Sequence, residues 1–501
     1  MGGLGTLDYM IVAIYLIASI ALGLRFARGQ KNLEDYFVAE RGAAWWVAGI
    51  SIIASDFSAI SYIGAPAWTF EKDLQYAMGI FLFPFIMLLI VYLFVPFLAR
   101  LRMFTVYEYL ERRFGLAART FASGLFLLLR GGHLANAIHA QAIVLGSITQ
   151  MTSFQAVVLV GSITTLYTVF GGMKAVLWTD VMQFFVLVGG IVAMVIAVLL
   201  PFGGNVAELW RIASETGHTR MFNFSLDPTL EITVWGLILG MLIINLSAYG
   251  SDQVIVQRYF TTSDRKQMTR AIMFNGLLTV PVVLALYFIG LGFAAYYTIN
   301  PQLQQDLSSA QQVVPHFITH TLPAGMAGLV IAGLFAATMG SLAAGFNSLS
   351  TASTMDFYLR FRHPKEAPDT NNLKAGRWAT LLWGVGCTLA ALMVGRLGGV
   401  VEIMGKINSF FSGPLIGMFL LGLLTRRANS FGVLAGAIIG TIVAWVISTT
   451  SVSWLWYGPA GCIITLVAGY LLSFMRPALA SEYVIPLTIW HHKGTREPAS
   501  L

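Results

Sequence analysis

The chain has 501 residues, of which 57% are hydrophobic and 11% charged, with a net charge of +7. Soluble domains carry about 25% charged residues, so this composition indicates a multi-pass membrane protein and excludes a soluble globular domain. The basic residues lie in short loops between apolar segments, as cytoplasmic loops require, so the positive charge does not indicate nucleic-acid binding. Cys387 and Cys462 both lie inside apolar segments, which excludes a disulfide framework and a cysteine metal site.

Thirteen apolar segments are long enough to cross a bilayer. Lys and Arg concentrate in the loops that follow the odd-numbered segments. The positive-inside rule then places the N-terminus outside and the C-terminus in the cytoplasm, in the inner or plasma membrane. The expected spans lie near 7–25, 44–70, 77–99, 120–149, 152–170, 174–201, 232–257, 268–298, 321–357, 375–395, 398–424, 428–449 and 454–475.

The second span, 44–70, carries polar residues at its centre. Asp56 falls near the middle of the membrane, where a carboxylate costs about 2.5–3.5 kcal/mol on insertion scales. Gly64 and Pro66 follow and weaken the helix. A broken helix with a polar centre is typical of ion and substrate sites in secondary transporters. The alternative is a cap at a kink, in which Ser55 or Asp56 satisfies freed backbone amides.

The fourth span, 120–149, places Arg130, His133 and Asn136 on one helical face. A guanidinium inside a membrane is functional by default and matches a carboxylate in shape. The alternative is an internal ion pair that only holds helices together. Its partner would be Asp56, Glu402 or Asp180.

The seventh span, 232–257, also has a polar centre that contains glycine, from Asn245 to Gln253. This span and the second span occupy matching positions in the two halves of the chain, which indicates a binding site near the membrane midplane. Asp252 either lines this site or pairs with Arg258 at the cytoplasmic end.

Several segments resemble the sodium:solute symporter family, which includes bacterial proline, galactose and sialic acid transporters. The segment from Gly161 to Ala175, followed by Trp178, Thr179 and Asp180, resembles its first signature. The second signature is matched by Gly413 to Gly417, Gly422 to Arg427, and Gly436 with Ala437. The segment from Asn347 to Asp356 resembles the end of the ninth span in sugar symporters.

The resemblance implies an all-α, LeuT-like inverted repeat of five plus five helices. The first repeat would be residues 44–201 and the second 232–424. Residues 1–43 and 428–475 would be peripheral, and 476–501 would form a cytoplasmic tail. The implied function is sodium-coupled symport of a small polar organic solute into the cell by alternating access.

The resemblance also implies a sodium site made by the broken second span and the ninth span. Sodium is a hard cation, and unwound carbonyl groups supply oxygen to it. Serine is common in the family at the position of Gly340, so Ser341 is left as the hydroxyl of this pair. Ala343 and Ala344 occupy the places of a second sodium site, which favours one sodium per cycle. The implied ligands are Ala54, Phe57, Ala337, Gly340 and Ser341.

Two carboxylates are candidates for ion coupling. Asp56 matches an aspartate that serves sodium coupling in the proline transporter branch, although binding of a substrate cation is the alternative. Asp180 matches an acidic residue near the sodium route in the family, and its alternative is a solvated carboxylate at a cytoplasmic helix N-terminus.

The substrate candidates come from the second, third, fourth and seventh spans. An arginine on the fourth span binds the carboxylate in the sialic acid branch, and Arg130 or His133 would take that role here. Ile60 and Ser61 stand where sugar carriers have an acid and an amide, so we expect a carboxylate-bearing solute rather than a hexose. The candidates are Ser58, Ser61, Tyr76, Arg130, His133, Asn245, Tyr249 and Gln253.

We therefore expect a transporter that has sodium as coupling ion, no other cofactor or metal, and no obligate protein partner. One alternative is proton coupling through Asp56 or Asp180, because the ion site lacks a hydroxyl. A second alternative is a transporter-like sensor, which the absence of an appended signalling domain disfavours. A membrane enzyme is disfavoured because no nucleophile and base, or set of metal ligands, stands out in the spans.

Overall fold

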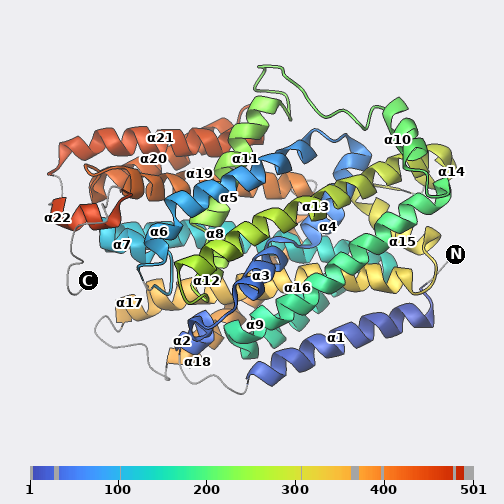
Figure 1. Cartoon of the computed structure of the whole chain (residues 1–501), viewed down its shortest axis with the longest axis horizontal. Helices are drawn as coiled ribbons and strands as arrows, with labels where there is room; N and C mark the ends of the chain where they lie inside the picture. The colour runs from blue at the N-terminus through green and yellow to red at the C-terminus, as the bar shows by residue number, and fades with distance from the viewer. Residues whose placement is uncertain are drawn as a thin grey trace.

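Long helices run along the longest axis of the molecule, either parallel or antiparallel to one another (Figure 1). The computed structural model describes residues 4–27, 33–101, 103–149, 151–305, 307–362, 372–395, 400–477 and 481–489, and its regular structure in these ranges is all helical. Residues 490–501 of the expected tail lie outside the described ranges.

The first part of the chain contains α1 (Thr6–Ala27), α2 (Leu33–Val38), α3 (Trp45–Asp56), α4 (Ala59–Glu71), η2 (Tyr76–Leu82), α5 (Phe83–Leu93), α6 (Val95–Leu98), α7 (Glu108–Phe114), α8 (Leu116–Thr149), α9 (Ser153–Leu199) and α10 (Val206–Glu215). The second part contains α11 (Val234–Gly250), α12 (Gln253–Tyr259), α13 (Arg265–Ile299), α14 (Pro301–Gln304), α15 (Val313–Thr321), α16 (Met326–Ala352), η5 (Ser353–Tyr358), α17 (Leu359–Arg362), α18 (Asn372–Val394), α19 (Val400–Leu424), α20 (Ser430–Ser448), α21 (Tyr457–Leu472) and α22 (Ser481–Val484).

Within the described ranges, nine helical stretches are long and apolar enough to cross a membrane, and two bent helix pairs raise the number to eleven. The expected number of thirteen is therefore not confirmed. The other two expected spans fall on α8 and on the first part of α9. Polar residues such as Arg130 and Asn136 reduce the apolar character of α8, and the apolar stretch Ser153–Leu166 is short.

The two bent pairs are the two spans with polar centres. α3 and α4 meet at 58°, and α11 and α12 meet at 52°. The first break comes at Phe57, whose backbone is extended, and the Ser58 side chain then caps α4 by accepting from the Ile60 amide at 3.2 Å. Pro66 lies inside α4, and so does Gly64. The expectation that these two residues mark the weak point is therefore wrong, because the break is made by the end of one helix and the capped start of the next.

α16 lies at the centre of the bundle and is buried over most of its length. It packs against α3, α8 and α9, while α20 and α21 pack against each other and against α19 at the edge of the bundle (Figure 1). α1 is held to the core through Asp8, whose Oδ1 accepts from the amides of Gly325 at 2.8 Å and Gly328 at 2.7 Å. These amides belong to the N-terminal turn of α16 and have no partner within the helix.

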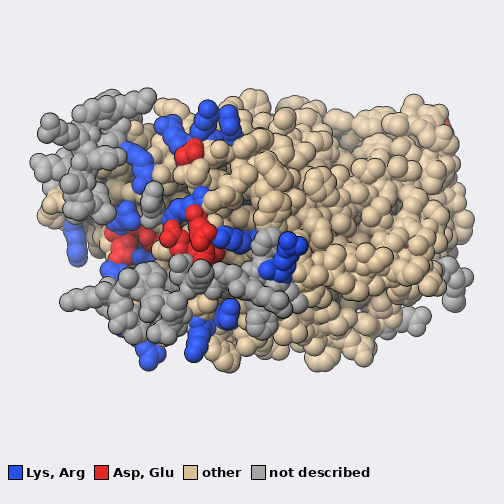
Figure 2. All heavy atoms as spheres, turned by 60° about the horizontal axis from the view of Figure 1, so that its bottom comes forward, with Lys and Arg blue, Asp and Glu red and all other residues tan. Residues whose placement is uncertain are grey.

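On the face that Figure 2 draws, charged side chains gather toward one end of the molecule. Figure 2 shows them at the left end, where Figure 1 places α7, α17 and α22, while most of the remaining visible surface carries neither sign. α1 begins at the opposite end of the bundle from α22 (Figure 1). An odd number of membrane crossings would give this arrangement.

Candidate ion and substrate site

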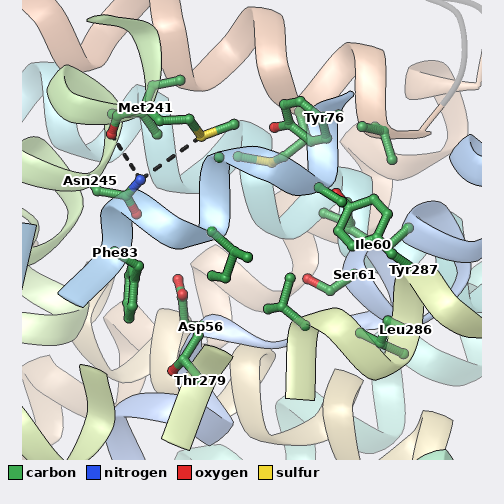
Figure 3. A pocket seen from close by; sticks show the side chains of 18 of the residues that line it. Asp56, Ile60, Ser61, Tyr76, Phe83, Met241, Asn245, Thr279, Leu286 and Tyr287 are labelled. Carbon is green, nitrogen blue, oxygen red and sulfur yellow. Dashed lines mark hydrogen bonds between the residues drawn. The ribbon is translucent and has the colours of Figure 1, made fainter. Parts of the chain in front are cut away.

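A cavity of about 230 Å³ lies beside the break between α3 and α4. Its wall comes from α3, α4, η2, α11, α13 and α19, so both halves of the chain contribute (Figure 3). The wall is mainly apolar, with a small number of polar groups, as is usual for small-molecule sites. These polar groups belong to Asp56, Ser61, Tyr76, Asn245, Thr279, Tyr287 and Asn408.

Asp56 is the last residue of α3, and its carboxylate points into the cavity (Figure 3). The Tyr249 hydroxyl donates to its Oδ2 at 3.0 Å. The positive charge of Arg130 and the negative charge of Asp252 also act on it. The carboxylate therefore has a donor and a nearby cation at the point where α3 ends.

Three of the expected substrate residues line the cavity. Ser61 lines the cavity from the first turn of α4. Asn245 lines it from α11, and the Asn245 Nδ2 donates to the Met241 carbonyl at 2.8 Å. Tyr76 stands at the start of η2 within an aromatic cluster, 5.3 Å from the Trp68 ring and 5.7 Å from the Trp454 ring, measured between centroids. The structure thus brings residues from distant spans to one cavity.

Arg130 and His133 are not among the residues that line this cavity. Arg130 Nε donates to Asp252 Oδ2 at 2.7 Å, and both side chains are buried. His133 Nδ1 lies 3.4 Å from Arg130 Nη1. The expected partners for an internal pair were therefore wrong, because the break between α11 and α12 places Asp252 opposite α8. For the same reason Asp252 does not pair with Arg258.

Three further candidates hold the structure around the cavity rather than line it. Ser58 caps α4. Tyr249 lies behind Asp56 and packs its ring against Phe83 at 5.2 Å. Gln253 accepts from the Val106 amide at 2.9 Å and donates to the Phe104 carbonyl at 2.7 Å, so its side chain fixes the loop before α7.

The expected sodium ligands lie where α3 ends against α16. Ala54 is in the last turn of α3, where carbonyl groups lack partners within the helix. Ala337 and Ser341 are buried in α16, and Ser341 Oγ donates to the Thr338 carbonyl at 3.2 Å. Phe57 lines the cavity at the break itself. The expected ion ligands and the cavity are thus adjacent.

Asp180 is fully buried beside these ligands, so the alternative of a solvated carboxylate is wrong. Its Oδ2 accepts from the Ser51 hydroxyl and from Arg258 Nη2, the latter at 3.3 Å. Its Oδ1 has no hydrogen-bond partner among the described residues. The carboxylate therefore keeps one oxygen available close to α16.

Sequence reasoning missed Thr279, Asn408 and Gln183. The first two line the cavity from α13 and α19, and Gln183 lies one turn after Asp180 in α9. All three are polar residues within apolar spans, and this signal was present in the sequence. Glu402 and Lys406 lie one turn apart on α19 and form an exposed ion pair, with 2.7 Å between Oε1 and Nζ.

A helical bundle in which two broken helices meet at a cavity with a carboxylate in its wall is the architecture of a secondary transporter. The model of the sodium:solute symporter family matches residues 36–440. The chain therefore belongs to the sodium:solute symporter family. It is a multi-pass membrane transporter that couples solute movement to sodium, and not an enzyme.

Proteins that are similar to this chain over most of its length have the names of sodium-coupled transporters. The sodium/sialic acid symporter NanT of Aliivibrio fischeri is 30% identical over 94% of each chain. The human sodium-coupled monocarboxylate transporter 1 is 27% identical over 89% of this chain and 74% of its own. A solved Na+-coupled sialic acid symporter, in a substrate-bound outward-open state, superposes with a TM-score of 0.88 at 28% identity, covering 95% of this chain and 99% of that one.

Proposed function

We propose that this symporter carries a small organic acid into the cell together with one sodium ion. The observation that carries the proposal is the cavity at the α3 and α4 break, lined by Asp56 and by hydroxyl and amide groups. The names of two relatives, for sialic acid and for monocarboxylates, support a carboxylate-bearing solute.

Neutral donor groups and the N-terminal end of α4 would hold the carboxylate of the solute. Among the described residues that line the cavity there is no Lys, Arg or His. Ile60 and Ser61 belong to the first turn of α4, whose positive end faces the cavity, and broken helices direct such ends at anionic substrate groups. Arg130 would act from behind, by offsetting the charge of Asp56 rather than by touching the solute.

Sodium would bind between the end of α3 and α16, with oxygen from Ala54, Phe57, Ala337 and Ser341. Asp56 and Asp180 flank this region on two sides and would couple the ion to the cavity. One sodium ion with one monocarboxylate carries no net charge, so we expect transport of a monocarboxylate to be electroneutral.

The proposal also includes the internal repeats, the number of spans and the orientation in the membrane. Residues 44–201 and 232–424 would form two inverted repeats within thirteen spans, supported by the breaks in matching positions at α3 and α4 and at α11 and α12. The N-terminus would lie outside and the C-terminus in the cytoplasm of the plasma membrane. The charged end of Figure 2 supports this orientation, because Lys and Arg favour the cytoplasmic side. Residues 1–43 and 428–475 would be peripheral and in contact with lipid, and residues 476–501 would form a cytoplasmic tail. The proposal includes no obligate protein partner.

Uptake into proteoliposomes tests this function. An inward sodium gradient should drive accumulation of a carboxylate solute, and Ser341→Ala should raise the sodium concentration for half-maximal uptake by about tenfold, which corresponds to ~1.4 kcal/mol. Uptake that follows a proton gradient and ignores sodium would contradict the proposed coupling. Competition by neutral sugars but not by carboxylates would contradict the proposed solute class.

A further inference from the structure

Gln183 lies against Gly340, a residue of the proposed sodium site that has no side chain of its own. The Gln183 side chain is buried, at 1% exposure. Neither its Oε1 nor its Nε2 has a hydrogen-bond partner among the described residues. The Tyr15 hydroxyl is also close to this amide, but it donates to Met339 Sδ at 3.8 Å. A buried amide oxygen without a partner is costly, so this oxygen needs a ligand.

Three oxygen atoms converge on the place that a side chain at position 340 would occupy. A methyl group built on Gly340 would lie 2.9 Å from Gln183 Oε1, 3.1 Å from the Ala54 carbonyl oxygen and 3.6 Å from Asp180 Oδ1. The Asp180 Oδ1 likewise has no partner among the described residues. Amide, carbonyl and carboxylate oxygens that converge on one point are what a hard cation requires.

We propose that Gln183 supplies sodium with the side-chain oxygen that a serine at position 340 would otherwise supply. The inference rests on the proposed sodium site. Position 340 and Gln183 exclude each other, because a side chain at 340 would approach Gln183 Oε1 to within 2.9 Å. Glycine at 340 therefore makes room for the amide. Both oxygens are neutral, so the exchange leaves the charge of the site unchanged.

Sodium binding to the purified transporter and sodium titration of uptake test the exchange. Gln183→Leu keeps the volume and removes the oxygen, so the half-saturating sodium concentration should rise by about tenfold, which corresponds to ~1.4 kcal/mol. Gln183→Ala also removes the oxygen and frees the space that a side chain at 340 needs, so adding Gly340→Ser to Gln183→Ala should restore most of the sodium affinity. Gln183→Met serves if the leucine variant does not fold, because the flexible thioether fits irregular gaps and also lacks oxygen.

A matched control removes a different buried amide that faces α16. Gln141 Oε1 accepts from the Thr338 hydroxyl at 2.5 Å, so this amide oxygen, unlike that of Gln183, already has a partner within the protein. Gln141→Leu should leave the half-saturating sodium concentration unchanged. It should lower the stability of the transporter by about as much as Gln183→Leu does.

Ser341→Ala separates the two ways in which the inference can fail. If neither Ser341→Ala nor Gln183→Leu weakens sodium binding, the proposed sodium site is wrong. If Ser341→Ala weakens it and Gln183→Leu does not, the site stands and the role of Gln183 is overturned. If Gln183→Ala weakens binding and Gly340→Ser fails to restore it in that background, the proposed exchange of oxygens is also overturned.

Discussion

Buried charges near the cavity are arranged in two separate pairs, and Asp56 stands apart from both. Arg130 pairs with Asp252, and Arg258 pairs with Asp180. Among the described residues, the Tyr249 hydroxyl is the one hydrogen-bond donor to Asp56, and the carboxylate faces the cavity. This carboxylate is therefore available to a transported species in the cavity.

Replacing Asp56 by asparagine tests this assignment. The amide oxygen can still accept from Tyr249, so folding should be nearly unchanged, while the lost charge should lower the initial uptake rate by at least about tenfold. The measurements are uptake into proteoliposomes and the melting temperature. Asp227→Asn, which removes an exposed carboxylate in the loop before α11, is the control. A normal uptake rate for Asp56→Asn would reduce Asp56 to a structural cap.

The broken element made by α3 and α4 depends on a local cap. Ser58 has extended backbone angles and accepts from the Ile60 amide, so it both ends the extended segment and starts α4. The first turn of α4 forms part of the cavity wall through Ile60 and Ser61. The cap therefore positions the proposed carboxylate-binding end of this helix.

Substitution of Ser58 by alanine should cost about 0.5–2 kcal/mol of stability, as loss of an N-cap usually does, and should also weaken solute binding. Thr152→Ala removes the N-cap of α9, far along the chain from the cavity, and should lower stability without changing solute affinity. Melting temperatures with and without solute distinguish the two. Equal solute-induced shifts in both variants would show that Ser58 has no positioning role.

The charged end of the whole molecule contains a network that joins both halves of the chain. Arg119, near the start of α8, donates to Asp356 in η5 at 2.8 Å and to Glu111 in α7 at 2.6 Å. Thr105 and Ser123 also donate to Asp356. Burial would raise the pKa of Glu111, but hydrogen bonds from Arg360 and Arg119 outweigh it and hold this pKa below its ordinary value.

We expect this network to stabilise the conformation in which the charged end of the molecule is closed and the cavity cannot be reached from that side. Removing one partner of a buried ion pair costs about 3–5 kcal/mol, and a bias of 1.4 kcal/mol already shifts populations about tenfold. Asp356→Asn should therefore make a cysteine placed at Thr279 in the cavity label at least several-fold faster from the side of the charged end. The native Cys387 and Cys462 are buried, which keeps background labelling low.

Glu402→Gln is the matched control, because it breaks an exposed ion pair with Lys406 outside this network. Labelling at Thr279 should not change in this variant. If Asp356→Asn leaves the labelling rate unchanged as well, the network holds the fold but does not control access.

The sequence by itself determined the membrane class, the family, the two broken spans and the place of Asp56, because these depend on local hydrophobicity and on polar residues within an apolar segment. The tertiary structure decided which charges pair. Arg130 and Asp252 are 122 positions apart in the chain, and Arg258 and Asp180 are 78 apart, so only helix packing brings them together. The same packing adds Thr279 and Asn408 to the cavity and sets Gln183 against Gly340. A pattern along one span cannot state which face of another span it meets, since that choice depends on how all the helices fill space together.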